Sequence, residues 1–355
     1  MLNRLFGFLG SDLAVDLGTV NTRISVPGQG LVLDEPSVVA VEQSGRRVFA
    51  EGCAVGHLAS QMLGRAPGTI SVVRPMREGV IYDFELAEAM LRYFLRKAQG
   101  GGWRFGPRVM ITVPGSISPV EKRAVFNSGL RAGARQVLLL PQHKAAAIGV
   151  GLPIAEPVAS MVCDIGGGTT EAAVMSLNDL VSSHSIRVGG DQMNGALIEY
   201  LKRNYQLRVG AAGAERLRIE LGSAFTLETE ITDEVSGVDQ ISGLPRKASI
   251  TSEEVREALA EPLHAIVVAI KETIDGCSPD LASDLVENGL VLTGGGALLR
   301  RMDRFVSEQT GLPCRVSDSP LEDVARGSQI CLEQLPRWRD AVESSDDDVP
   351  VRPAI

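Results

Sequence analysis

Short apolar runs alternate along the chain with longer segments whose apolar residues recur every three or four positions. Continuous apolar runs are typical of buried strands, and the longer spacing is typical of amphipathic helices. Strands that alternate with helices indicate an α/β fold. The predicted strands are, in chain order, DLAVDLG, TRISV, PSVVAV, RVMITV, QVLLL, SMVCDIG, EAAVMS and GLVLTGG.

Three predicted helices have a recognisable first turn. A hydroxyl residue followed three positions later by Glu forms a capping box, and proline is favoured just inside the helix. This pattern occurs at residues 118–121, 251–254 and 319–322. We therefore expect helices to begin at Ser118, Thr251 and Ser319.

The composition is that of a folded chain with more than one core. Its 355 residues predict two domains or one two-lobed fold. Hydrophobic residues make up 44%, and the net charge is −9 with no basic block, which argues against nucleic acid as a partner. The five cysteines show no metal-ligand spacing, as expected in a reducing compartment, and we interpret them as buried small residues.

The first ten residues, MLNRLFGFLG, carry one apolar helical face formed by Leu2, Leu5, Phe6 and Leu9. The segment is too short for a signal peptide, and no apolar run in the chain is long enough to span a membrane. We favour a helix that lies in the membrane interface. The alternative is a frayed end or a helix docked on its own domain.

Two distant segments repeat one pattern without a gap. VDLGTVNTRISV begins at Val15 and CDIGGGTTEAAV begins at Cys163. In each, a strand leads to an Asp, a glycine-containing turn follows, and a second strand begins with polar residues. The separation is far beyond the period of a solenoid repeat, so we predict a duplicated domain.

The two repeated turns have the chemistry of phosphate binding, although each alone also fits an ordinary turn. Glycine lets backbone N–H groups approach a phosphate, and polar side chains add donors. Carboxylates beside phosphates require a cation, so Asp16 and Asp164 predict Mg²⁺ held largely through water. Neither turn has the P-loop sequence. The candidate phosphate ligands are Thr19, Asn21, Thr22, Gly166, Gly167, Gly168 and Thr169.

A third glycine cluster lies in GLVLTGGGALLRRMD, where Gly294, Gly295 and Gly296 join a buried strand to an amphipathic helix. Backbone amides at a helix start can face a phosphate or let a flat nucleotide lie against the chain. By itself the cluster fits a tight turn equally well. Together with the two hairpins it predicts a nucleotide cleft.

The order DLGTVNT, DIGGGTTE, LTGGGALL is similar to the two phosphate loops and the adenosine loop of the actin, sugar kinase and heat-shock chaperone superfamily. MLGRAPG, RPMREGVIYDF, VEKRAV, SIRVGGDQMN and VARG further resemble the MreB family of bacterial actin homologues. The resemblance extends from about residue 11 to about residue 335.

This resemblance implies an α/β, actin-like ATPase fold with two duplicated lobes, each with a mixed sheet and helices, and four subdomains around a nucleotide cleft. The expected parts are an amphipathic N-terminal membrane helix (1–10), a first-lobe core (11–34 and 74–147, with 318–337 packing back on it), a small first-lobe subdomain (35–73), a second-lobe core (148–183 and 248–317), a small second-lobe subdomain (184–247) and an acidic disordered tail (338–355).

The resemblance also implies a function. Members of this family bind ATP with Mg²⁺ and polymerise into paired filaments on the inner face of the cytoplasmic membrane. The filaments organise cell-wall synthesis and determine rod shape, which implies partners among the membrane proteins of wall synthesis. Glu215 and Arg218 resemble a helix pair that contacts adenosine, although the family more often has Lys at the second position.

A glycine-rich loop, GGGWRFGPRV, carries Trp103 and Phe105 with no periodicity that would bury them. Aromatic side chains in such a loop predict insertion at a membrane interface, and the resemblance implies a hydrophobic loop at this place. Repeated along a filament, two weak anchors add through effective concentration. The alternative is that the two aromatics cap a local cluster.

The segment LLLPQHKAAAIG departs from the family, which usually reads Glu-Glu-Pro-Met before AAAIG. Gln142 occupies the place of the glutamate that positions the attacking water. An amide orients water but cannot accept its proton, which typically costs about 10²-fold to 10⁴-fold in rate. We therefore expect slow ATP hydrolysis, with Glu171 and Asp164 as the other catalytic candidates. Lys144 either offsets phosphate charge or points to solvent, and we favour solvent.

A second departure is GGDQMN, where the family usually has GGDEMD. Gln192 and Asn194 replace two acids beside the cleft or at a subunit contact, and the sequence leaves both interpretations open.

We favour an ATP-dependent, membrane-associated filament protein. The alternatives are a divergent paralogue that binds but hardly hydrolyses ATP and modulates other filaments, and a soluble small-molecule kinase of the same superfamily. A chaperone ATPase is disfavoured because no substrate-binding domain follows residue 340.

Overall fold

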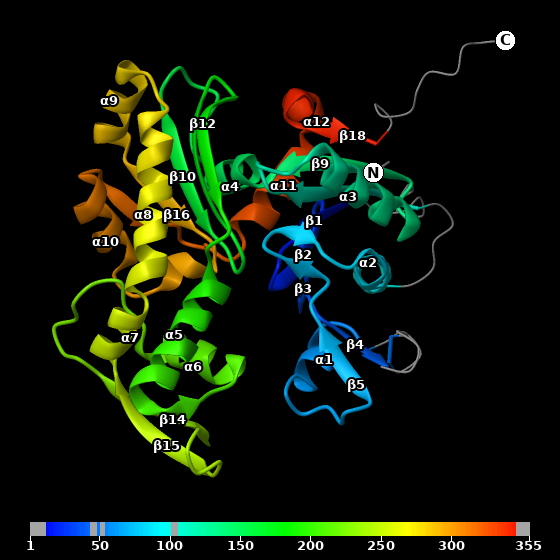
Figure 1. Cartoon of the computed structure of the whole chain (residues 1–355). Coiled ribbons are helices and arrows are strands. Elements are labelled where there is room, and N and C mark those ends of the chain that lie inside the picture. The colour runs from blue at the N-terminus through cyan, green and yellow to red at the C-terminus, as the bar shows by residue number, and fades with distance from the viewer. Residues whose placement is uncertain (1–11, 43–47, 50–53, 101–105, 346–355) are drawn as a thin grey trace. The chain divides into compact units, whose positions relative to one another are not determined.

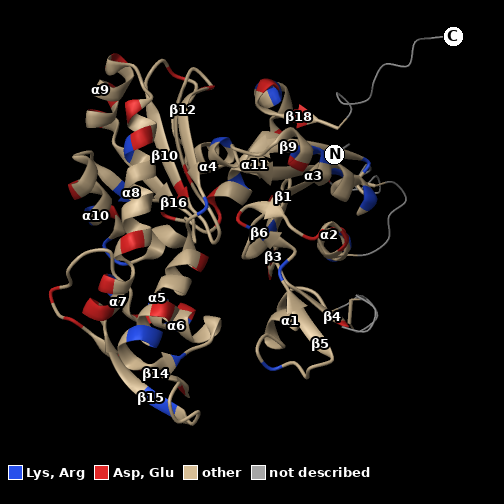
Figure 2. Cartoon of the chain, in the orientation of Figure 1, with Lys and Arg blue, Asp and Glu red and all other residues tan. Residues whose placement is uncertain are grey.

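The computed structural model describes residues 12–42, 48–49, 54–100 and 106–345. The chain folds into two compact units, as its length predicts (Figure 1). Unit 1 consists of residues 1–152 and 322–355, and unit 2 consists of residues 153–321. Acidic and basic residues are interspersed over the helices of unit 2 (Figure 2).

Unit 1 is built on a six-stranded mixed sheet. Its parallel strands β1, β8 and β9 are runs of buried apolar residues, as expected for strands covered on both faces. Strands β2 and β3 continue the sheet beyond β1 as an antiparallel meander. In sheet order the strands are β18 (Glu343–Ser344), β9 (Gln136–Pro141), β8 (Arg108–Val113), β1 (Leu13–Leu17), β2 (Asn21–Val26) and β3 (Gly30–Pro36).

Helices α4 and α11 of unit 1 pack closely against each other (Figure 1). They cross at Gly149 and Gly327, where a Cβ on either residue would overlap the backbone of the other helix. This contact fixes α4, which begins at Gln142. The helices of this part are α2 (Phe84–Ala98), α3 (Pro119–Arg131), α4 (Gln142–Val150), α11 (Asp323–Glu333) and α12 (Leu335–Trp338).

A smaller part of unit 1 follows β3 and has its own apolar cluster. Buried Glu35, at the end of β3, forms an ion pair with Lys97 of α2 and accepts a hydrogen bond from the His57 amide at 2.8 Å. These contacts tie the small part to the main sheet. Its elements are β4 (Val39–Glu42), α1 (His57–Gln61) and β5 (Ile70–Val73), and the hairpin of β6 (Met76–Arg77) and β7 (Val80–Ile81) leads back to α2.

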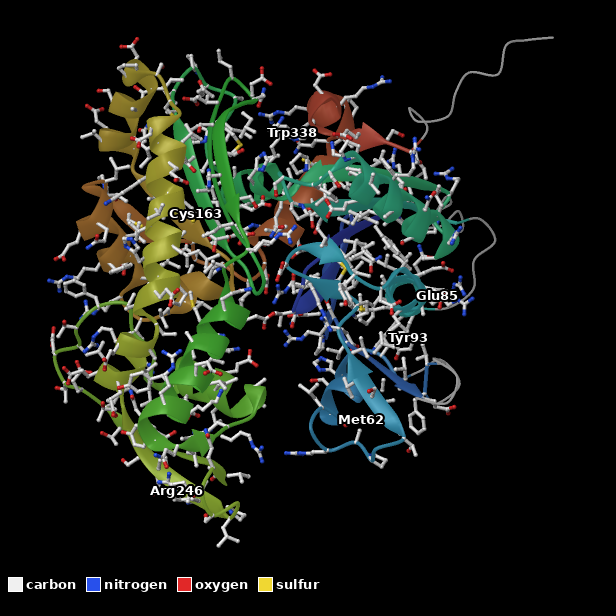
Figure 3. The ribbon with its side chains drawn as sticks, in the orientation of Figure 1. Met62, Glu85, Tyr93, Cys163, Arg246 and Trp338 are labelled. Carbon is white, nitrogen blue, oxygen red and sulfur yellow. The ribbon has the colours of Figure 1, made fainter. Side chains whose placement is uncertain are left out.

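Apart from β18, which has no counterpart among the described strands of unit 2, that unit repeats the strand order and direction of unit 1. β10, β16 and β17 are parallel, and β11 and β12 extend the sheet antiparallel beyond β10. Cys163, labelled in Figure 3, lies buried in the central strand. The strands are β10 (Ser160–Ile165), β11 (Thr170–Ser176), β12 (Asp179–Ile186), β16 (Leu290–Thr293) and β17 (Cys314–Val316).

Helix α8 lies along this sheet and contacts β11 and β12 (Figure 1). A second, three-stranded sheet packs with α6 and α7. The helices of unit 2 are α5 (Gly190–Tyr205), α6 (Ala211–Leu221), α7 (Ser252–Ala258), α8 (Ala260–Asp275), α9 (Pro279–Asn288) and α10 (Met302–Thr310), and the small sheet has β13 (Leu207–Arg208), β14 (Thr232–Asp239) and β15 (Pro245–Thr251).

The apolar strand predictions are confirmed in position, and so is the duplication, because both sheets share one topology. Strands β12, β14 and β15 were not predicted, since their polar, half-exposed residues give no apolar run. Capping boxes are present at Ser118 and Thr251. The prediction at Ser319 is wrong: this residue lies in a turn and α11 begins at Asp323 without a side-chain cap.

The prediction of a disordered tail from residue 338 is wrong for residues 338–345. Trp338 is buried (Figure 3), and β18 pairs with β9, where Glu343 also contacts Lys122 of α3. Apolar burial of Trp338 and one strand pairing outweigh the acidic composition of the segment. The remaining tail lies outside the described residues. Among the described helices, none is long and apolar enough to cross a membrane.

Candidate functional site

The β1–β2 hairpin of unit 1 carries the first predicted phosphate turn. Asp16 is 8% exposed and accepts a hydrogen bond from Thr112 of β8 at 3.0 Å. A Cβ at Gly18 would lie 2.5 Å from the Asn21 carbonyl oxygen, so the turn requires glycine. The structure therefore places a buried carboxylate directly before a turn that only glycine can make.

The polar residues of this turn have different surroundings. The Thr19 hydroxyl accepts a hydrogen bond from the Gly79 amide at 3.0 Å, and the Asn21 amide donates to Asp34 at 2.8 Å. Thr22 is fully buried, and its hydroxyl bonds at 2.8 Å with Ser37, which donates to the Gly18 carbonyl. The Thr22 side chain thus stabilises the turn from behind.

Burial is the main cause that raises the pKa of Asp16 above its usual value, while Arg23 and the bond from Thr112 lower it. An ionised Asp16 therefore costs stability in the isolated chain, which a nearby cation would offset. Among the described residues, no group of three or more His, Cys, Asp and Glu is arranged to hold a metal ion. A single buried carboxylate fits Mg²⁺ that keeps most of its ligands as water and phosphate.

Gln142 begins α4 directly after β9 ends at Pro141. Because β1, β8 and β9 are parallel, with Val15 beside Ile111 and Ile111 beside Leu139, the ends of β1 and β9 lie at the same sheet edge. Gln142 therefore lies at a strand-to-helix corner, two strands from the Asp16 turn. Lys144 is half-buried; burial raises the pKa of the Cys331 thiol of α11 to about 12, and the charge of Lys144 opposes that effect.

The β10–β11 hairpin of unit 2 carries the second predicted phosphate turn. Asp164 and Glu171 lie directly opposite each other in the register and are 3% and 2% exposed. Directly opposed residues of an antiparallel pair share one face of the sheet. Two buried carboxylates therefore lie side by side at the base of the Gly166–Thr169 turn.

The start of α5 supports this turn. The amides of Gly190 and Asp191 donate to the carbonyls of Gly166 and Gly167 at 3.0 and 2.7 Å. A Cβ at Gly189 would lie 2.6 Å from the Gly166 oxygen, so only glycine lets α5 approach so closely. Sequence reasoning missed the role of Gly189 and Gly190, although the segment SIRVGGDQMN contained the signal.

The third glycine cluster packs on the same hairpin. Gly294 has φ 81°, and a Cβ there would overlap the Asp164 carboxylate and the Ile165 carbonyl. A Cβ at Gly296 would overlap the Ile165 side chain, whereas at Gly295 it would meet only Leu321 at 3.4 Å. Close packing therefore explains Gly294 and Gly296, and brings the predicted adenosine loop to the phosphate turn.

Glu215 and Arg218 lie one turn apart in α6, with 3.9 Å between Glu215 Oε1 and Arg218 Nη2. Arg218 also donates from Nε to Asn194 of α5 at 2.8 Å, and its side chain is 12% exposed. Burial lowers the pKa of Arg218, and Glu215 and Asp191 oppose the effect. Gln192 accepts a hydrogen bond from the Gly189 amide and so caps the start of α5.

The structure thus brings the predicted residues into two groups, one in each unit. Burial raises the pKa of the Cys163 thiol well above its usual value, as expected for an inert buried cysteine. The membrane candidates Leu2, Leu5, Phe6, Leu9, Trp103 and Phe105 lie outside the described residues.

Comparison with known proteins gives one consistent result. The sequence model of the MreB/Mbl protein family matches residues 10–340. The cell shape-determining protein MreB of Escherichia coli (strain K12) is 49% identical over 336 residues, which cover 94% of this chain and 97% of that protein.

Solved structures agree with this result. MreB5 of Spiroplasma citri bound to ADP has a TM-score of 0.86 and 31% identity, covering 92% of this chain and 98% of that one, and its complex with AMPPNP scores the same. The MamK double helical filament has a TM-score of 0.78 at 21% identity, covering 92% of this chain and 100% of that one, which supports the fold alone. The expected actin-like α/β fold is confirmed.

Proposed function

This chain belongs to the MreB/Mbl family, and from that premise we propose that it binds ATP, polymerises into membrane-associated filaments and helps determine rod cell shape. Its relative in E. coli is a cell shape-determining protein. MreB5, at 31% identity, binds ADP and AMPPNP. Organisation of wall synthesis through membrane-protein partners, on the inner face of the membrane, is part of the proposal.

One observation carries the proposal of nucleotide binding. Each unit places a buried Asp at the end of its central strand, directly before a glycine-containing turn. In unit 1 a Cβ at Gly18 would overlap the turn itself, and in unit 2 a Cβ at Gly189 or Gly294 would overlap the segment that carries the turn. In unit 2, α5 and the Gly294 loop both close on that turn. Buried carboxylates cost stability unless a cation is nearby, so this arrangement is best explained by a ligand that brings Mg²⁺ and phosphate.

We assign the roles as follows. Thr19 and Asn21 of unit 1 and the Gly166–Thr169 turn of unit 2 bind phosphates, while Thr22 holds its turn in shape. Asp16 and Asp164 hold Mg²⁺ mainly through water, and Mg²⁺ supplies neutralisation of phosphate charge when bound. Glu215 and Arg218, with Gly294, Gly295 and Gly296, bind the nucleoside side of ATP. The four-subdomain division expected from the family completes this proposal.

Hydrolysis is proposed to be slow. Gln142 can orient a water by hydrogen bonds but cannot accept its proton, so the proton acceptor has to be another group. Glu171 is the candidate, because it is a buried carboxylate beside Asp164 at the phosphate turn. A paralogue that binds ATP with hardly any turnover remains the second candidate, favoured specifically by Gln142.

The deciding experiment is sedimentation with liposomes, with and without ATP. We expect ATP-dependent pelleting of the full chain. A variant that lacks residues 1–10 and carries Trp103→Ala should still polymerise but leave the liposomes. If no concentration of protein pellets with ATP, the filament proposal is wrong; if the variant pellets with liposomes as well as the full chain, the membrane residues are wrongly assigned.

A further inference from the structure

One hydrogen bond joins the side chains of α6 and α5 next to the second predicted phosphate turn. Arg218 Nε of α6 donates to Asn194 Oδ1 of α5 over 2.8 Å. Both side chains are largely buried, so the bond fixes the position of the guanidinium.

The contact holds the guanidinium beside the phosphate turn. A Cβ on Gly190 would lie 3.4 Å from Arg218 Nη2 and 3.8 Å from the Cα of Gly167, so the guanidinium and the turn both lie close to Gly190. The nearby acidic groups are Glu215, 3.9 Å away, and Asp191 at the start of α5.

The side chain at position 194 determines whether the guanidinium of Arg218 keeps a net positive charge for another ligand. An amide oxygen accepts the bond from Nε but carries no charge, whereas Asp would form an ion pair that neutralises the guanidinium. Arginine can donate to a partner through Nε and to a phosphate through its Nη groups, and lysine has no second, separately directed donor.

We infer that Asn194 is a positioning residue that fixes Arg218 through Nε and leaves the charged Nη groups for the phosphates of the bound nucleotide. The inference rests on the proposed nucleotide binding and assigns Arg218 to the phosphate side as well as the nucleoside side. Of the two places left open for Asn194 by the sequence, the cleft and a subunit contact, the inference selects the nucleotide cleft.

The test is a double-mutant cycle of Asn194→Asp, Arg218→Lys and both together. Affinities for ATP, ADP and AMP are measured by competition with a fluorescent ATP analogue. Each single change should weaken ATP binding about fivefold to tenfold and AMP binding less, because the lost interaction is with phosphate charge. The double variant should bind ATP about as weakly as the weaker of the two single variants, because both changes remove the same positioned charge.

Arg216→Lys is the matched control, since Arg216 lies in the same helix but bonds with Glu220 and Asp233, and it should leave the affinities unchanged. The inference is wrong if the losses of ATP affinity in the two single variants multiply in the double variant. It is also wrong if the single changes weaken AMP and ATP binding equally and lower thermal stability to match. If the original chain binds no nucleotide, the proposed function fails and the inference fails with it. Binding by the original chain with an additive cycle removes the inference alone.

Discussion

The β1–β2 hairpin of unit 1 and the β10–β11 hairpin of unit 2 share one topology but carry different charges. In unit 1 the residues opposite one another across β1, β2 and β3 are Asp16, Arg23 and Asp34. In unit 2 the equivalent row is Asp164, Glu171 and Ser185. Duplication has therefore kept the aspartate and reversed the charge of its neighbour.

The difference separates two tasks that a phosphate turn can serve. In unit 1, Arg23 lowers the pKa of Asp16 and bonds with Asp34 at 3.2 Å, so the row is held by alternating charge. Unit 2 instead concentrates two buried carboxylates and no base in the same row. In the proposed mechanism, unit 1 therefore serves mainly to bind phosphate, while unit 2 supplies Glu171 to act on water.

The largest effect is expected from filling the close approach in unit 2. Gly294→Ala would place a Cβ against Asp164 and Ile165 at a positive φ, so we expect a loss of more than about 3 kcal/mol in the free energy of unfolding and no stabilisation by ATP. Gly311→Ala has the same sign of φ with open space and should cost only about 1 kcal/mol. Denaturant unfolding with and without ATP measures the free energy of unfolding of both variants. Similar losses in the two variants would mean that backbone strain at positive φ, and not overlap with Asp164, causes the destabilisation.

Substitutions of Gln142 in unit 1 and of Glu171 in unit 2 should change the rate of ATP hydrolysis in opposite directions. Glu171→Gln should lower phosphate release about 10²-fold because it removes the proton acceptor. It should leave the free energy of unfolding unchanged or higher, since it also removes repulsion with Asp164. Gln142→Glu should raise phosphate release at least about tenfold.

A phosphate-release assay at saturating ATP measures these rates, with Glu228→Gln, whose side chain is 93% exposed, as control. If the original chain hydrolyses ATP as fast as the Gln142→Glu variant, our interpretation of the corner is wrong. A Glu171→Gln variant with full turnover would instead remove Glu171 from the mechanism.

Giving unit 1 the charge row of unit 2 should destabilise it. Arg23→Glu would leave three acids in one row, with buried Asp16 at one end and exposed Asp34 at the other, so we expect a loss of about 2 kcal/mol in the free energy of unfolding. Arg23→Gln, which removes the base without adding an acid, should cost less. Denaturant midpoints at low salt check the order, and equal losses for the two variants would show that Arg23 acts through packing.

The smallest effect concerns Asp16 and has the opposite sign. Because burial raises the pKa of Asp16, the folded chain holds this proton more tightly, and stability falls as the pH rises past the ordinary pKa of Asp. At neutral pH, Asp16→Asn should therefore raise the free energy of unfolding without ligand, on the order of 1 kcal/mol, yet weaken stabilisation by Mg²⁺ and ATP. Unfolding curves recorded from acid to neutral pH compare Asp16→Asn with the control Asp179→Asn, which changes an exposed residue. If stability depends on pH in the same way in both variants, Asp16 does not cause the predicted pH dependence.

Much of the fold could be predicted because its signals are local. The central strands are continuous apolar runs, and the repeated Asp–glycine pattern indicates the duplication through residue type and spacing alone. The half-exposed strands β12, β14 and β15 and the ordered segment at Trp338 could not be predicted, since their stability comes from pairing and burial against distant residues.

The sequence by itself therefore determined the fold class, the two glycine-containing turns that follow Asp16 and Asp164, and the presence of Gln142 after β9, because residue type and spacing along the chain carry these. Only the tertiary structure decided that Asp164 faces Glu171 while Asp16 faces Arg23, and that Asn194 bonds with Arg218. Strand register and helix packing bring those residues together across long stretches of chain. Their pairing is a property of the folded state, and so are the charge and hydrogen-bond chemistry that follow from it.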